Sequence, residues 1–130
     1  MSLDKIKRNE TTKKYLDKNP LCRYSMNFRV KVKNYLTRGI FPRKNSDLLD
    51  ILGISLEGYK AYLEMQFDEG MSWDNNTKKG WHIDHIIPTS KAKDLNELKQ
   101  LLHYTNTQPL WAKENLKKYK NDQTDIKKAI

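Results

Sequence analysis

The chain has 130 residues, with 25 Lys and Arg against 16 Asp and Glu. This length fits one domain, and no segment approaches the roughly 18 apolar residues of a membrane span. The polar N-terminus lacks the apolar run of a signal peptide, so we expect an intracellular protein with no membrane partner. Because Cys22 is the only cysteine, an internal disulfide and a paired-cysteine zinc site are both excluded. Any metal would need oxygen or imidazole ligands.

Positive charge is concentrated in the N-terminal third. Residues 1–44 contain 13 Lys and Arg against 3 acids, whereas residues 45–130 are nearly neutral. Lys and Arg neutralise phosphates and release counterions, so this asymmetry predicts a basic arm over 1–44 that binds a polyanion such as DNA. The alternative is a solvated face that only keeps the protein soluble.

Two helices are expected in this arm. Residues 2–18 are rich in helix formers and stop before Pro20. From Leu21 a second helix is expected to end at Gly39. Its apolar face has helical spacing: Leu21, Tyr24, Phe28, Val32, Tyr35 and Leu36. The basic residues that fall mostly off this face are the candidates for phosphate contacts: Arg23, Arg29, Lys31, Lys33 and Arg38. The alternation over residues 30–33 leaves a short strand as a competing interpretation.

The middle of the chain reads as two short helices and a loop. Ser46 is a candidate N-cap for a helix over 47–52 that ends at Gly53. Ser55 is a candidate N-cap for a second helix that runs to about Phe67. The buried stripe of the second helix is expected at Leu56, Tyr59, Leu63 and Phe67. Residues 68–80 have the composition of a loop, in which Met71 and Trp73 are expected to pack onto the core.

The last segment predicts strand, connection, strand and helix. A strand is expected over 81–88, an extended segment over 105–111 and a helix over 112–120. Between them, Asp94 can cap a helix with the apolar face Leu95, Leu98, Leu101 and Leu102. The fold class is therefore α+β, with additional N-terminal helices.

The candidate chemistry lies in residues 81–118, which hold all three histidines. Asp84 and His85 are adjacent, so on a regular strand they would face opposite sides, although a twisted strand end can bring both to one site. If Asp84 binds a divalent cation while His85 stays neutral, His85 can take a proton from water. Such a pair supplies what phosphodiester hydrolysis requires.

Several motifs occur together in one order. They are residues 70–73 (GMSW), 81–88 (WHIDHIIP), 105–112 (TNTQPLWA) and 114–118 (ENLKK). This combination resembles the HNH endonuclease family, in the form common among phage-encoded members. The resemblance implies a ββα-metal core at 81–120 within a nuclease domain over 45–130. The chain lacks the cysteine pairs of the zinc-stapled members and has Thr107 where Leu is usual.

The resemblance also implies roles for individual residues. His85 would be the general base that activates water, and Asn106 would tie the loop so that His85 is held in position. Asp84 and Asn115 would be metal ligands, and Lys118 would lie near a phosphate. His82 stays open, because it could contact phosphate, assist the metal or only pack. His103 is expected to be a surface or capping residue, and the aromatic residues around the site are expected to be core: Trp81, Tyr104 and Trp111.

The expected activity is hydrolysis of DNA with one divalent ion, leaving a 5′-phosphate and a 3′-hydroxyl. Oxygen ligands favour Mg²⁺ or Mn²⁺, while a nearby histidine would admit Zn²⁺ or Ni²⁺. We expect a monomer or weak homodimer in the cytoplasm of a bacterial host, with a phage as an alternative source of the gene. The alternatives are a catalytically inactive DNA-binding module of the same fold, or a ribonuclease.

Overall fold

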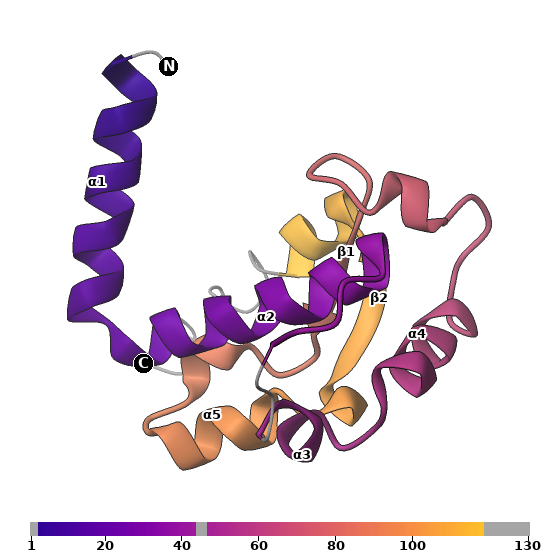
Figure 1. Cartoon of the computed structure of the whole chain (residues 1–130). Coiled ribbons are helices and arrows are strands. Elements are labelled where there is room, and N and C mark those ends of the chain that lie inside the picture. The colour runs from indigo at the N-terminus through magenta and orange to yellow at the C-terminus, as the bar shows by residue number, and fades with distance from the viewer. Residues whose placement is uncertain (1–2, 44–46, 119–130) are drawn as a thin grey trace.

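Helices surround one pair of antiparallel strands in the computed structural model, which describes residues 3–43 and 47–118, with side chains from residue 10 onward (Figure 1). The helices are α1 (Leu3–Lys18), α2 (Pro20–Arg38), α3 (Leu48–Leu52), α4 (Leu56–Glu64) and α5 (Leu95–Leu101). The strands are β1 (Trp81–His85) and β2 (Thr107–Trp111), and residues 112–118 form a helix directly after β2. Short 3₁₀ turns are η1 (Trp73–Asn75), η2 (Thr89–Lys91) and η3 (Tyr104–Asn106). The predicted α+β class is confirmed.

Helix α2 begins with Pro20 and ends at Gly39, whose φ of 70° provides a left-handed cap. It buries Phe28, Val32 and Leu36, which confirms the predicted apolar face and shows that the strand interpretation of residues 30–33 was wrong. These side chains share one core with buried residues of α3, α4, α5 and the turn after α5: Leu48, Leu52, Leu56, Tyr59, Leu63, Leu98 and Leu102. The expected boundary near residue 44 stays a prediction, but α2 is packed into the body of the protein.

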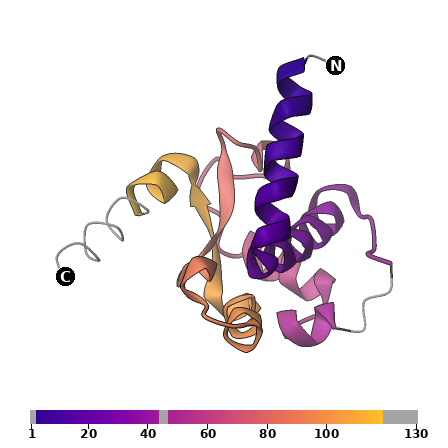
Figure 2. The same cartoon turned by 90° about the vertical axis from the view of Figure 1, so that its left-hand side faces the viewer.

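Helix α1 leaves this body at a sharp elbow around Asn19 and projects away from it (Figures 1 and 2). The predicted helix over 2–18 is confirmed for the residues described. Arg23 of α2 forms an ion pair with Asp17 of α1 across the elbow. The basic side chains described on α1 therefore lie outside the core.

The two short helices follow the predicted caps in part. Asp47 occupies the N-cap position of α3, while the expected cap Ser46 lies outside the described residues. The Ser55 side chain accepts a hydrogen bond from the Gly58 N–H, as predicted for the cap of α4. Helix α4 ends at Glu64, three residues earlier than expected, because the chain turns so that Phe67 can stack against other aromatic rings.

The first strand starts from an aromatic cluster. Trp81 is fully buried, and its ring lies 5.0 Å from Phe67 and 5.2 Å from Trp73, centroid to centroid. Its Nε1 donates to the Ser72 carbonyl at 2.7 Å, so the indole N–H is satisfied. Met71 is also buried, which confirms that the 68–80 loop is packed onto the core. These contacts fix the start of β1.

Strand β1 is shorter than predicted and ends at His85 rather than Pro88. It pairs antiparallel with β2, with Asp84 opposite Gln108 and His85 opposite Thr107. The hydroxyl of Thr107 is buried and bonds to the Tyr59 hydroxyl at 2.8 Å and to the Tyr104 carbonyl at 2.7 Å. Thr107 thus anchors β2 to α4.

Helix α5 is capped as predicted, with Asp94 Oδ1 accepting from the Glu97 N–H at 2.8 Å. Leu98 and Leu102 are buried, but Leu95, expected on the same face, is exposed. His103 caps η3 and packs against Gly53, where a Cβ would lie 2.1 Å from His103 Nε2. His103 is therefore structural, as predicted. Among the described residues, no helix is long and apolar enough to cross a membrane.

Candidate active site

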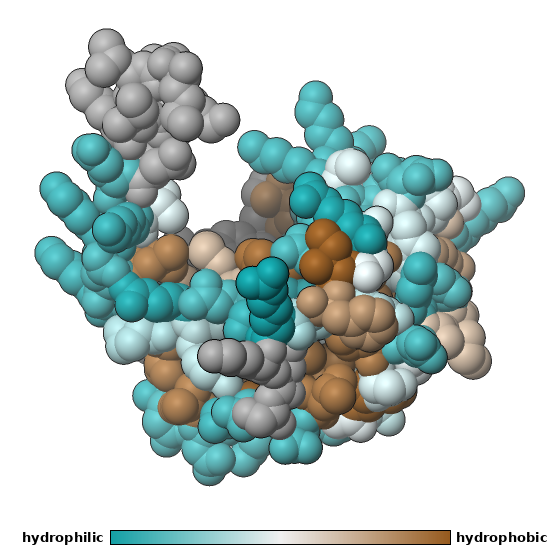
Figure 3. All heavy atoms as spheres, viewed as in Figure 1, coloured by the Kyte–Doolittle hydropathy of each residue, from teal (hydrophilic) through white to brown (hydrophobic). Residues whose placement is uncertain are grey.

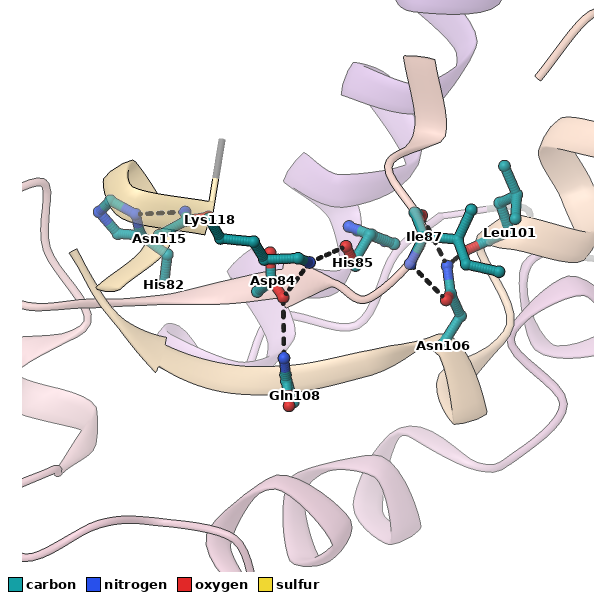
Figure 4. A network of polar contacts seen from close by, with 9 residues as sticks. All are labelled: His82, Asp84, His85, Ile87, Leu101, Asn106, Gln108, Asn115 and Lys118. Atoms are coloured by element: carbon teal, nitrogen blue, oxygen red, sulfur yellow. Dashed lines mark hydrogen bonds and ion pairs between the residues drawn. The ribbon is translucent and has the colours of Figure 1, made fainter. Parts of the chain in front are cut away.

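Asp84 and His85 open onto one cleft of about 200 Å³ at the end of β1. Adjacent residues of a regular strand face opposite sides, yet Asp84 and His85, the last two residues of β1, both line this cleft. The opposite wall comes from the helix after β2, which contributes Asn115 and Lys118 (Figure 4). The fold therefore brings these four residues, named from the sequence, to one cleft.

The Asp84 carboxylate is almost enclosed, with 7% of its surface exposed. Its Oδ2 accepts hydrogen bonds from Gln108 Nε2 at 3.0 Å and from Lys118 Nζ at 2.8 Å. The Lys118 ammonium also donates to the His85 carbonyl at 2.9 Å. Sequence reasoning assigned no role to Gln108, although strand pairing would have placed it opposite Asp84. A buried carboxylate requires such partners, because an unpaired charge there is costly.

The pKa of His85 is lowered to about 4, first by burial and then by the nearby positive charge of Arg29. Lys118 lowers the pKa further, while the Asp84 carboxylate opposes these effects. The imidazole is therefore neutral near pH 7 and has one nitrogen free to accept a proton.

The loop that follows β1 is fastened by the side chain of Asn106. Its Oδ1 accepts from the Ile87 N–H at 2.9 Å, and its Nδ2 donates to the carbonyls of Ile87 at 3.0 Å and Leu101 at 2.8 Å. The Ile86 N–H also donates to the Asn106 carbonyl at 2.8 Å. Asn106 thus connects the chain just beyond His85 to the end of α5 (Figure 4).

His82 contacts Asn115 rather than Asp84. Its Nε2 lies 3.0 Å from the Lys78 carbonyl, which can only accept, so we assign the proton to Nε2. Nδ1 is then an acceptor for Asn115 Nδ2 at 3.3 Å. With its amide nitrogen directed to His82, Asn115 has its Oδ1 left for another partner. The three roles left open for His82 stay untested, and the contact adds another, in which the imidazole orients the amide of Asn115.

The five basic residues predicted on α2 are placed in different surroundings. Arg29 lines the cleft, and its Nη2 donates to the Thr89 hydroxyl. Lys33 lines an apolar cavity of about 210 Å³ that also touches His85. Arg23 is engaged at the elbow with Asp17, whereas Lys31 and Arg38 line neither the cleft nor this cavity. All five residues are exposed.

The oxygen donors fit a hard divalent cation that keeps part of its water shell. Asp84 Oδ1 accepts no hydrogen bond within the described residues, and Asn115 Oδ1 is directed away from His82. Mg²⁺ is commonly held by one or two protein oxygens together with waters and substrate phosphates. Within the described part of the chain no three or more His, Cys, Asp or Glu side chains gather as a metal site. These ligands therefore suit an ion that also binds water and substrate phosphate, rather than one that is enclosed by protein ligands alone.

Comparison with known proteins finds relatives but no described activity. No family model and no solved structure matches the chain. Two uncharacterized proteins of Acanthamoeba polyphaga mimivirus match it. One is 34% identical over 115 residues, covering 82% of this chain and 48% of the relative. The other is 27% identical over 128 residues, covering 96% and 55%.

The chain spans about half the length of the curated relatives it matches. Both relatives belong to a virus of amoebae, so they do not support the expected phage origin. The bacterial cytoplasm accordingly stays a prediction.

Proposed function

We propose that this chain is a metal-dependent DNA endonuclease of the HNH type, with a ββα-metal core over residues 81–120. The observation that supports it best is the shared cleft at the end of β1. There a neutral His85 and a buried Asp84 face Asn115 and Lys118 of the helix after β2. A proton acceptor, two ligand oxygens and a phosphate-binding ammonium are the groups that phosphodiester hydrolysis requires.

His85 is the general base in this proposal. Its imidazole takes a proton from a water molecule as the water oxygen forms a bond to phosphorus. The bond from phosphorus to the 3′ oxygen breaks, and that oxygen takes up a proton from solvent, leaving a 3′-hydroxyl and a 5′-phosphate. His85 then releases its proton to solvent. Asn106 holds the chain beyond His85 and so keeps the imidazole in place.

Substrate binding makes His85 a better base. Burial is the largest cause of its lowered pKa, and the charges of Arg29 and Lys118 lower this pKa further. A phosphate beside these cations offsets their charge, so the pKa of His85 rises by the part that they contribute. A divalent cation held by the oxygens of Asp84 and Asn115 would supply positive charge for the phosphate oxygens, with Mg²⁺ or Mn²⁺ preferred by such ligands.

A DNA-binding module without turnover is the rival that one contact favours. Lys118 already supplies the counter-charge of Asp84, so the carboxylate is satisfied without a metal. A ribonuclease is the further alternative, but no feature of the site selects RNA.

Incubation with supercoiled plasmid separates the endonuclease from the binder. We expect nicking in Mg²⁺ or Mn²⁺ that chelator abolishes, and a loss of about 10²- to 10⁴-fold in His85→Ala. Asp84→Asn should lose activity, while Asp50→Asn on α3 is the matched control and should retain it. If wild type and His85→Ala bind the plasmid but leave it equally intact with Mg²⁺, Mn²⁺, Ni²⁺ and Zn²⁺, the binder is correct. A matched RNA substrate tests the ribonuclease.

A further inference from the structure

Helix α2 brings one arginine to the edge of the catalytic pair. Arg29 follows Phe28, which is 8% exposed and packed in the core, so the position of this part of α2 is fixed. The Arg29 side chain lines the cleft together with Asp84, His85 and Lys118. Its positive charge acts on His85, which shows that the two groups are close enough to interact.

Arg29 has no acidic partner among the described residues. Its hydrogen bond goes to the neutral hydroxyl of Thr89, whereas Arg23 on the same helix is paired with Asp17. A guanidinium carries five N–H donors, so one hydroxyl leaves most of them free. The side chain keeps solvent exposure, yet the protein atoms around it lower its pKa. Such a cation is poorly compensated and open to an anion in the cleft.

The second cation of the cleft is engaged differently. Lys118 donates to the Asp84 carboxylate and to the His85 carbonyl, so its charge is already compensated. Arg29 is therefore the group better suited to a new anion. The planar fork of a guanidinium matches two oxygens of one phosphate, which an ammonium cannot do.

The cleft also continues past Arg29. Arg29, Thr89 and Ser90 line both the cleft and a groove of about 550 Å³ at the elbow between α1 and α2. A nucleic acid strand that leaves the cleft along this groove would pass Arg29 with its phosphates.

We propose that Arg29 is a catalytic residue that binds the non-bridging oxygens of the phosphate being cleaved. This inference rests on the proposed nuclease function. It makes α2 a part of the active site, in addition to a surface for backbone phosphates elsewhere on the nucleic acid.

Steady-state cleavage kinetics distinguish these two roles. Arg29→Met should lower kcat by about 10²-fold, the usual loss of one charge-stabilising donor, and raise KM by about tenfold, because the contact to the phosphate is also lost in the ground state. Arg29→Lys, which keeps the charge but not the fork, should lie between it and wild type. Lys79→Met removes one positive charge from the exposed loop over 68–80, outside the basic arm and at a residue that lines neither the cleft nor the groove, and should change neither constant. A higher KM with unchanged kcat in Arg29→Met would overturn the proposal.

Binding of inorganic phosphate tests the site without turnover. In a titration followed by NMR, phosphate should shift the Nε–Hε signal of Arg29, and Arg29→Met should weaken phosphate binding at least about tenfold, the equivalent of one good ionic contact. Phosphate binding at Arg29 in a protein that cuts no nucleic acid would refute the nuclease but keep the anion site. Equal phosphate affinity in wild type and Arg29→Met would refute the anion site. If Arg29→Met fails to fold, Arg29→Lys decides between these results by the same two measurements.

Discussion

Lys118 and Asp84 form an ion pair whose two members differ in exposure. The carboxylate is 7% exposed, the ammonium is 28% exposed, and 2.8 Å separates Nζ from Oδ2. An enclosed carboxylate needs a counter-charge, and Lys118 provides it from the cleft side. In the proposed nuclease, a divalent cation at Asp84 would take over this role, and Lys118 would replace it in the metal-free protein.

Removing Lys118 should therefore expose a dependence on metal. Lys118→Met should lower the free energy of unfolding by about 1–3 kcal/mol, because among the described residues Gln108 is then the one partner left to Asp84. Mn²⁺ should restore more stability to this variant than it adds to wild type. Urea unfolding with and without Mn²⁺ measures both effects, with the exposed neighbour Lys117→Met as control. If Mn²⁺ raises the free energy of unfolding equally in wild type and Lys118→Met, the metal does not replace Lys118 as the counter-charge of Asp84.

The lowered pKa of His85 predicts acid sensitivity of the metal-free fold. The pKa of His85 is about 4 in the folded protein and about 6.5, the ordinary value, in the unfolded chain. Between these values the unfolded chain binds more protons, so stability falls as pH drops from about 6.5 to 4, by at most about 3 kcal/mol. Urea unfolding in chelator from pH 7.5 to 4.5 should give a smaller slope for His85→Gln than for wild type. Parallel curves would show that the imidazole is not held neutral by the fold.

The contact between His82 and Asn115 predicts an indirect effect on metal binding. His82→Ala removes the acceptor for Asn115 Nδ2, so the amide can rotate and its oxygen is no longer directed. Loss of such a supporting group typically weakens metal affinity by about 10-fold or more. Mn²⁺ titration of His82→Ala, of Asn115→Ala and of the variant that carries both changes tests whether the two residues act together on metal affinity. If His82→Ala still weakens binding in the Asn115→Ala background, His82 acts independently of Asn115.

Periodicity and capping residues were sufficient to predict most of the fold. The four-residue spacing of Phe28, Val32 and Leu36 located α2 and its buried face, and Ser55 located the start of α4. Element ends were less accurate, because they depend on distant partners. Phe67 had the right spacing for α4, yet stacking on Trp73 and Trp81 takes it out of the helix.

The candidate site was predictable as a set of residues but not as a set of contacts. The order of the motifs placed Asp84, His85 and Asn115 together. The partners of Asp84 depend on the strand register and on the helix after β2, which no local pattern determines. Likewise, nothing in the spacing of the basic residues distinguished Arg29, because proximity to His85 follows from how α2 packs.

Asn106 should control the order of the loop after β1. Asn106→Ala removes three hydrogen bonds at a partly buried position, so stability should fall by about 1–3 kcal/mol. Hydrogen exchange of the Ile87 amide should accelerate, because its acceptor is the Asn106 side chain. The Ile86 amide, which donates to the Asn106 backbone, is an internal reference. Asn96→Ala on the exposed side of α5 is the matched control. If hydrogen exchange of the Ile87 amide is unchanged in Asn106→Ala, the Asn106 side chain does not hold this loop in place.

The projecting helix α1 should supply the salt-dependent part of DNA affinity. Figure 3 shows hydrophilic side chains along the lower part of α1, which stands away from the body, and three lysines with described side chains lie there: Lys13, Lys14 and Lys18. Changing all three to Gln should weaken binding and reduce the slope of log affinity against log salt by up to about 2.7, or about 0.9 for each phosphate that is no longer neutralised. Because α1 lies outside the core, thermal stability should be unchanged. Fluorescence anisotropy from 50 to 300 mM salt measures the slope, and an unchanged slope would mean that α1 does not bind DNA.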